Sequence, residues 1–162
     1  MLDLAQAREF FRLSPFMVDL GVEPVAVEPG RLTTTLAIAP RHLQHTGFVH
    51  AGVSAAMADH TMGAAAQTLA PAGHWALTAD LRTSLLRAAQ GERLVCTAWV
   101  LKSGRSLSFT EAEVHVERAG PEGVERLLVM KASATMALAS HVRAVAAAPA
   151  EAAAPASSTS GD

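Results

Sequence analysis

The spacing of apolar and polar residues first predicts two short strands near the start of the chain. Residues 22–28 and 31–39 have strand-like composition, and apolar side chains alternate along the second segment. Pro29 and Gly30 stand between them, at the central positions of a turn. The two segments are therefore expected to form a hairpin.

A long helix is predicted next, over residues 50–69. Pro71 and Gly73 follow this segment and end it. Alanine and glycine recur along it, so the helix is thin and apolar on most sides. Such a helix is typical of the interior of a fold, where small side chains let a sheet approach closely.

Four further strands are predicted after the helix, and short turns rich in glycine separate them. They cover residues 74–86, 93–102, 106–117 and 124–138. Short turns imply that neighbouring strands run antiparallel. The order of two strands, one buried helix and four strands predicts an α+β fold in which the helix packs against one sheet.

The chain is expected to have three parts. Residues 1–21 contain two short lead-in helices, the first over residues 4–12 with Asp3 as its cap. Residues 22–139 form the folded domain. Residues 144–162 consist of Ala, Pro, Ser, Gly and a few acids, so they are expected to be a disordered tail.

Composition and charge narrow the functional classes. The net charge of −2 and the lack of a Lys/Arg stripe argue against nucleic acid as a partner. No apolar run approaches the roughly 18 residues of a membrane helix, and residues 1–11 lack a signal pattern, so a soluble cytoplasmic protein is expected. The one cysteine, Cys96, lies in an alternating apolar run and is expected in the core.

The start of the long helix carries the candidate chemistry. Gly52 lies at the helix entry, where free backbone N–H groups and the helix dipole favour a negatively charged oxygen. Asp59 follows seven residues later, about two turns along the same side. A carboxylate in an alanine-rich buried helix is unfavourable unless it is paired or functional. The alternative is a structural acid that accepts hydrogen bonds from a nearby loop.

Other chemistries have weaker support in the sequence. The spacing of the histidines at 42, 45, 50 and 60 fits no closed zinc pattern, so no metal is expected. Ser54 and Thr61 are not in a Gly-x-Ser-x-Gly elbow, which argues against a serine hydrolase. Taken alone, His50 is better explained by hydrogen bonds to loop carbonyls than by catalysis.

One motif resembles a known family. Val49-His50-Ala51-Gly52, then six residues, Asp59 and Gly63-Ala64-Ala65, resembles the hotdog-fold thioesterases of the phenylacetic acid degradation type, the PaaI-like group of the 4-hydroxybenzoyl-CoA thioesterase superfamily. Segments 78–81, 85–89 and 101–107 also resemble the later strands of that family. The resemblance covers about residues 20–139.

The resemblance implies a fold and an activity. The fold is a long central helix wrapped by an antiparallel sheet of five or six strands. The chain pairs into a homodimer or homotetramer, with active sites at the subunit interface. The activity is hydrolysis of small aromatic or short- to medium-chain acyl-CoA thioesters to the free acid and CoA. No separate cofactor is implied, because coenzyme A is part of the substrate.

It also implies roles for individual residues. Asp59 matches the catalytic carboxylate, acting as general base on water or as nucleophile. The backbone N–H groups near Ala51 and Gly52 of the facing subunit polarise the thioester carbonyl. His50 supports that loop or touches the thioester oxygen, and Thr78 orients water.

Two positions depart from the family pattern, and one segment is matched to coenzyme A. Many relatives have Asn at the position of Gln44 and glycine at the position of Ala51. The backbone donor at Ala51 survives its methyl group, while the acyl pocket becomes tighter. The segment matched to the coenzyme A nucleotide comprises Lys102, Ser103, Gly104, Arg105 and Ser106. The alternative is that the charged residues of this segment bind no ligand and are only solvated, as charged turn residues usually are.

Two other functions remain open from the sequence. A hotdog acyl-CoA hydratase or dehydratase pairs His with Asp or Glu in local signatures that this sequence does not show. A non-catalytic acyl-CoA binding module is the second alternative, and ligand binding without turnover distinguishes it from an enzyme.

Overall fold

The computed structural model describes residues 3–140 as one sheet with three α-helices. The helices are α1 (Leu4–Arg12), α2 (Pro15–Leu20) and α3 (Ala51–Gln67), with a short 3-10 turn at Pro40–His42. The strands are β1 (Val22–Glu28), β2 (Arg31–Ala37), β3 (Trp75–Leu85), β4 (Arg93–Ser103), β5 (Leu107–Gly120) and β6 (Gly123–Ala139). The tail predicted for residues 144–162 lies outside the described residues.

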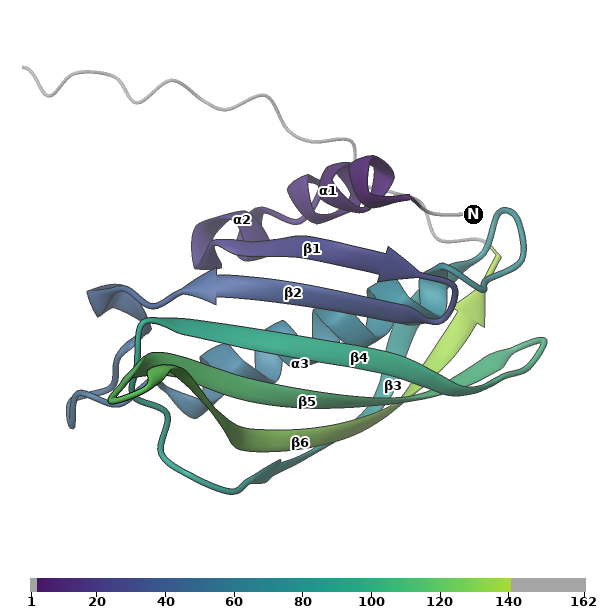
Figure 1. The fold of residues 1–162 in the computed structure, drawn as a ribbon. Coiled ribbons are helices and arrows are strands. Elements are labelled where there is room, and N and C mark those ends of the chain that lie inside the picture. Colours follow the sequence, from purple (N-terminus) through teal and green to yellow (C-terminus); the bar gives the residue numbers. More distant parts are fainter. Residues whose placement is uncertain (1–2, 141–162) are drawn as a thin grey trace, which may run out of the picture.

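The sheet wraps around α3, as Figure 1 shows. Its strand order is β1-β2-β4-β5-β6-β3, and every neighbouring pair is antiparallel. Close approach is possible because the sheet-facing residues of α3 are small or unbranched. Met57, Ala58, Met62 and Ala65 are all fully buried. The predicted hotdog arrangement, a long helix against one antiparallel sheet, is confirmed.

The pairing of strands fixes which side chains face the helix. On β4 the inward row is Leu94, Cys96 and Ala98, all fully buried. Cys96 is therefore a core residue, as predicted. Burial raises the pKa of its thiol to about 12, so it remains a protonated, unreactive group.

Side-chain caps make α3 shorter than the predicted span of residues 50–69. His50 lies outside the helix as its N-cap. At the other end, Thr68 is the C-cap and its hydroxyl donates to the Ala65 carbonyl at 2.7 Å. The same hydroxyl accepts the Gly30 N–H at 2.7 Å, which ties the β1–β2 turn to the end of α3.

The first N-terminal helix, α1, packs against β1 and α3. Asp3 and Gln6 form a reciprocal capping box at the start of α1. The rings of Phe10 and Phe11 then contact the His60 ring on α3, with centroids 5.5 and 4.5 Å away. α1, which lies along β1 in Figure 1, thus also contacts α3 through these two rings.

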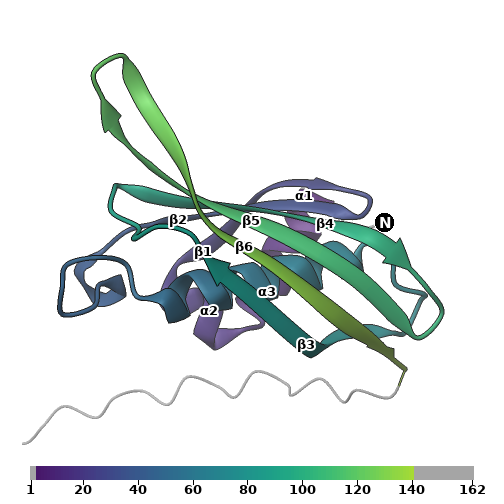
Figure 2. The same cartoon turned by 90° about the horizontal axis from the view of Figure 1, so that it is seen from below.

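Strand β3 forms one margin of the sheet (Figure 2). Within residues 3–140 it pairs only with β6, and most of its side chains are exposed. The exposed side chains include Leu77, Leu81 and Leu85. An exposed apolar edge strand is a template for pairing with another chain.

None of the described helices is long and apolar enough to cross a membrane.

Candidate active site

Asp59 and Thr78 meet between α3 and β3. The Thr78 hydroxyl donates to Asp59 Oδ1 at 2.7 Å and also contacts the Met136 sulfur at 3.5 Å. Asp59 is partly exposed, and Oδ2 has no protein hydrogen bond within residues 3–140. One carboxylate oxygen is therefore held in place, and the other is free to accept a proton from water.

The entry of α3 is organised by His50. Its Nδ1 accepts the Gly52 N–H at 2.9 Å, so the proton of the neutral ring is on Nε2. The Val53 N–H donates to the His50 carbonyl at 3.0 Å. Among the described residues, the Ala51 N–H has no hydrogen-bond acceptor. The geometry therefore favours Ala51 over Gly52 as the donor available to a substrate oxygen.

The helix also sets the distance between this donor and the carboxylate. Asp59 comes eight positions after Ala51, which is about 12 Å along the axis. A thioester carbonyl and its attacking water lie within a few ångströms of each other. One chain therefore cannot present its helix entry and its Asp59 to the same substrate carbonyl.

The loop before α3 is held by backbone and side-chain hydrogen bonds. The His50 N–H donates to the His42 carbonyl at 2.9 Å, and His42 Nδ1 accepts the Ala39 N–H at 3.0 Å. Burial, together with the charge of Arg41, lowers the pKa of His42, so this brace is a neutral ring. Gln44 donates to Thr46 Oγ1 at 2.8 Å, which turns its amide nitrogen toward its own loop.

A pocket of about 420 Å³ lies beside the entry of α3. It is lined mainly by apolar side chains of the loop before α3, the segment after β3, and β6. The lining residues are Gln44, Phe48, Val49, Ala51, Ser54, Leu85, Leu86, Arg87, Ala88, Ala89, Val129 and Met130. Arg87 was not singled out from the sequence, although it is the one charge in an apolar run. It donates to the Leu128 carbonyl at 3.1 Å.

The structure does not bring the predicted coenzyme A segment to this pocket in one chain. Residues 102–106 comprise the last two residues of β4 and the β4–β5 turn, near the end of the sheet where α3 finishes (Figure 1). The Gly104 N–H donates to the Leu107 carbonyl and the Leu138 N–H to the Ser106 carbonyl, both at 2.8 Å. Lys102 and Arg105 are exposed and form no ion pair within residues 3–140.

His60 lies next to Asp59 in sequence but has a different environment. Its ring is enclosed by Phe10 and Phe11, and its Nε2 is buried without a partner among the described residues. Burial lowers the pKa of His60 to about 4, and the nearby Asp59 charge only partly opposes this shift. His60 is thus neutral near pH 7 and belongs to the apolar packing.

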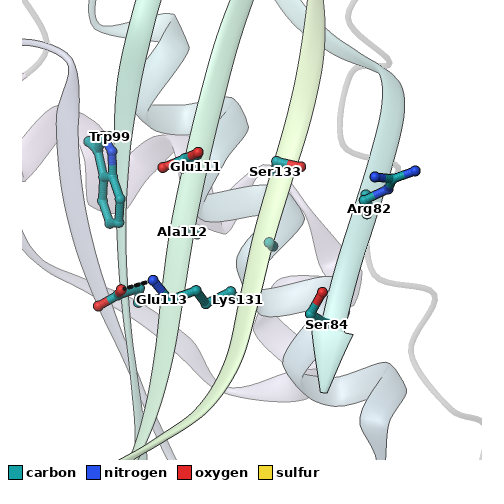
Figure 3. A pocket seen from close by; sticks show the side chains of 9 residues that line it. Arg82, Ser84, Trp99, Glu111, Ala112, Glu113, Lys131 and Ser133 are labelled. Carbon is teal, nitrogen blue, oxygen red and sulfur yellow. Dashed lines mark ion pairs between the residues drawn. The ribbon is translucent and has the colours of Figure 1, made fainter. Parts of the chain in front are cut away.

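A smaller hollow of about 180 Å³ lies on the face of the sheet that α3 does not cover (Figure 3). Its wall includes Trp99, Glu111 and the Lys131–Glu113 ion pair, whose charged atoms are 3.0 Å apart. The sheet separates this hollow from Asp59. It is therefore not part of the candidate active site.

Comparison with known proteins identifies the family. Residues 46–121 match the model of the thioesterase superfamily. A thioesterase family protein from Silicibacter pomeroyi is 30% identical, with a TM-score of 0.77 over 83% of this chain and 97% of that one. Acyl-coenzyme A thioesterase 13 from Homo sapiens is 27% identical over 72% of this chain and 80% of its own length. A mutant of the phenylacetic acid degradation protein PaaI from Thermus thermophilus is 24% identical and shares the fold, with a TM-score of 0.65 over 76% and 98% of the two chains. This chain belongs to the thioesterase superfamily and is a thioester hydrolase.

Proposed function

We propose that the protein hydrolyses acyl-CoA thioesters, with Asp59 as the general base. The observation that carries the proposal is the hydrogen bond from Thr78 to Asp59 Oδ1 at 2.7 Å. It orients a partly exposed carboxylate on a rigid helix and leaves Oδ2 for a water molecule. Acyl-coenzyme A as substrate is supported by the human relative, which is an acyl-coenzyme A thioesterase.

In the proposed reaction, Asp59 takes a proton from water while the water oxygen attacks the thioester carbonyl carbon. The Ala51 N–H stabilises the negative charge on the carbonyl oxygen. When the tetrahedral intermediate collapses, the carbon–sulfur bond breaks and the CoA sulfur receives the proton. The products are a carboxylic acid and CoA. General base catalysis typically supplies about 10² to 10⁴ in rate, and one oxyanion donor about 3 to 4 kcal/mol.

The proposed site needs two copies of the chain. Within one chain Ala51 and Asp59 are about 12 Å apart along the axis of α3. A second copy paired antiparallel along the exposed edge of β3 brings the entry of one α3 towards Asp59 of the other. Because the two copies would run antiparallel, the β4–β5 turn of one copy would lie at the same end of the pair as Ala51 of the other copy.

The proposed substrates are small aromatic and short- to medium-chain acyl-CoA thioesters. The pocket beside Ala51 has apolar walls from Phe48, Leu85 and Met130, which suit an apolar acyl group. Lys102 and Arg105 are exposed cations without intramolecular partners in the described structure, and they are assigned to the phosphates of the CoA nucleotide.

The test is release of free CoA thiol from acetyl-, hexanoyl-, benzoyl- and phenylacetyl-CoA. Asp59→Asn keeps the size of the side chain and removes its basicity, so we expect kcat to fall by at least about 10². Asp19→Asn, at an exposed acid on α2, is the matched control and keeps wild-type turnover. Full turnover by folded Asp59→Asn would refute the assigned base. Tight binding of acyl-CoA by the wild type without turnover would identify a binding module.

A further inference from the structure

Gly63 occupies a helical position where nothing in the described chain requires glycine. It lies inside α3, where glycine is less favourable than alanine because it has more backbone freedom to lose. A Cβ atom built at Gly63 meets no atom of residues 3–140 within 4 Å, apart from the backbone of its own helix and its two chain neighbours. By contrast, a Cβ at Gly30 lies 3.0 Å from a Leu69 methyl group, and Gly30 has a φ of +70°. The space above Gly63 is therefore open in the described structure.

This open position adjoins the proposed base. Gly63 is four residues after Asp59, so it lies about 6 Å further along the axis and about 40° around it. Both residues are on the side of α3 that is partly exposed. A group bound at the Asp59 carboxylate and extending towards the end of α3 passes directly over the Gly63 backbone.

The surroundings of Gly63 set the limits of this path. On one flank the His60 ring is packed by Phe10, which in turn stacks on Trp75 with ring centroids 6.1 Å apart. Further along, Gln67 closes the path, because its Nε2 donates to the His74 carbonyl at 2.9 Å and its Oε1 accepts the Ala76 N–H at 3.0 Å. The path from Asp59 to Gln67 is about 12 Å long.

We propose that Gly63 is a specificity-determining residue, whose missing side chain makes room for the acyl group of the substrate next to Asp59. This inference rests on the proposed acyl-CoA hydrolysis by a pair of copies, in which the pocket beside Ala51 of one copy adjoins Asp59 and Gly63 of the other, so that both copies line the acyl group. The flank formed by Phe10, neutral His60 and Trp75 is aromatic, and it favours aryl and medium-length acyl groups over acetyl. Adding a side chain at Gly63 excludes the larger groups while leaving the carbonyl and the base in place.

The experiment compares wild type, Gly63→Ala and Gly63→Leu on acetyl-, hexanoyl- and phenylacetyl-CoA. For the two larger substrates, we expect kcat/KM to fall about tenfold in Gly63→Ala and about a hundredfold in Gly63→Leu, in the range that single-group steric discrimination reaches. Acetyl-CoA is the internal control, and its kcat/KM changes less than threefold. The melting temperature of Gly63→Ala is at least that of the wild type, because alanine is the better helix former.

Three other results would each overturn the inference. Equal losses on all three substrates would mean that Gly63 does not select the acyl group. Unchanged selectivity in folded Gly63→Leu would mean that the acyl group takes another path. Loss of self-association in Gly63→Leu, measured by light scattering after size exclusion, would assign the open space to the helix of a second copy. These results differ from those expected if the proposed function itself is wrong. In that case the wild type would hydrolyse none of the substrates, or Asp59→Asn would be fully active.

Discussion

Thr78 Oγ1 and Asp59 Oδ1 are 2.7 Å apart, and their hydrogen bond joins the middle of α3 to the edge strand β3. The bond restricts the carboxylate to one orientation, which is valuable for a base that must meet a water molecule at hydrogen-bond distance. It also places the base beside the sheet edge where a second copy is proposed to pair.

Thr78→Val tests this bond, because valine keeps the branched shape and lacks the hydroxyl. We expect kcat to fall about tenfold, the effect of losing roughly 1 to 1.5 kcal/mol of hydrogen bonding in the transition state, with KM little changed. Thr78→Ser keeps a hydroxyl and should recover most of the rate. Equal rates for the valine and serine variants would show that the hydroxyl plays no part in positioning Asp59.

His50 is expected to act chiefly on the stability of α3. Its Nδ1 caps the Gly52 N–H at 2.9 Å, so His50→Ala leaves that donor without a partner. Loss of an N-cap lowers the free energy of unfolding by about 0.5 to 2 kcal/mol. His50→Asn supplies another N-cap acceptor and should restore most of the stability. Urea unfolding of the three proteins measures the difference, and identical midpoints for wild type and His50→Ala would contradict the capping role.

Much of this site could be predicted from the sequence because it lies on one helix. Helical periodicity alone places Gly52 and Asp59 on the same side, and the resemblance adds Thr78. The capping of Gly52 by His50 could not be predicted, since it depends on how the imidazole ring is turned at the helix entry. Because the ring accepts the Gly52 N–H, the Ala51 N–H is the donor at the helix entry that has no acceptor within residues 3–140.

The sequence also could not predict which distant segments lie close together in the fold. Residues 102–106 are a recognisable turn, but the direction of β4 puts them at the far end of the sheet from Ala51. The enclosure of His60 by Phe10 and Phe11 depends on how α1 packs back onto α3, across about 50 intervening residues of chain. Local patterns define the elements, while packing decides which of their side chains meet.

Lys102 and Arg105 are predicted to bind the CoA nucleotide. Replacing both with Ala should raise KM for acyl-CoA about tenfold and leave kcat within twofold, because the contacts are remote from the reacting carbonyl. The effect should shrink as the salt concentration rises, since exposed charges are screened. Arg8→Ala, an exposed cation on α1, is the control. An unchanged KM in the double variant would identify the turn residues as solvated charges.

His60 is expected to make stability depend on pH. Burial lowers its folded-state pKa to about 4, from the ordinary value of 6.5 that applies to the unfolded chain. Above pH 6.5 both states hold a neutral ring, and the stability of the fold is unaffected by this group. As the pH falls from 6.5 towards 4, the unfolded chain takes up the proton first, so the folded state loses stability.

His60→Phe is the variant that isolates this effect. Phenylalanine keeps an aromatic ring against Phe10 and Phe11 and removes the titratable nitrogen that is buried without a partner among the described residues. Between pH 7.5 and pH 5, the wild type should lose about 1 to 2 kcal/mol more of unfolding free energy than His60→Phe. His42 and His115 also have lowered pKa values, but both proteins contain them, so they contribute equally to the two curves. Urea titrations at the two pH values give the difference, and parallel losses in the two proteins would mean that His60 is accessible to protons in the folded state.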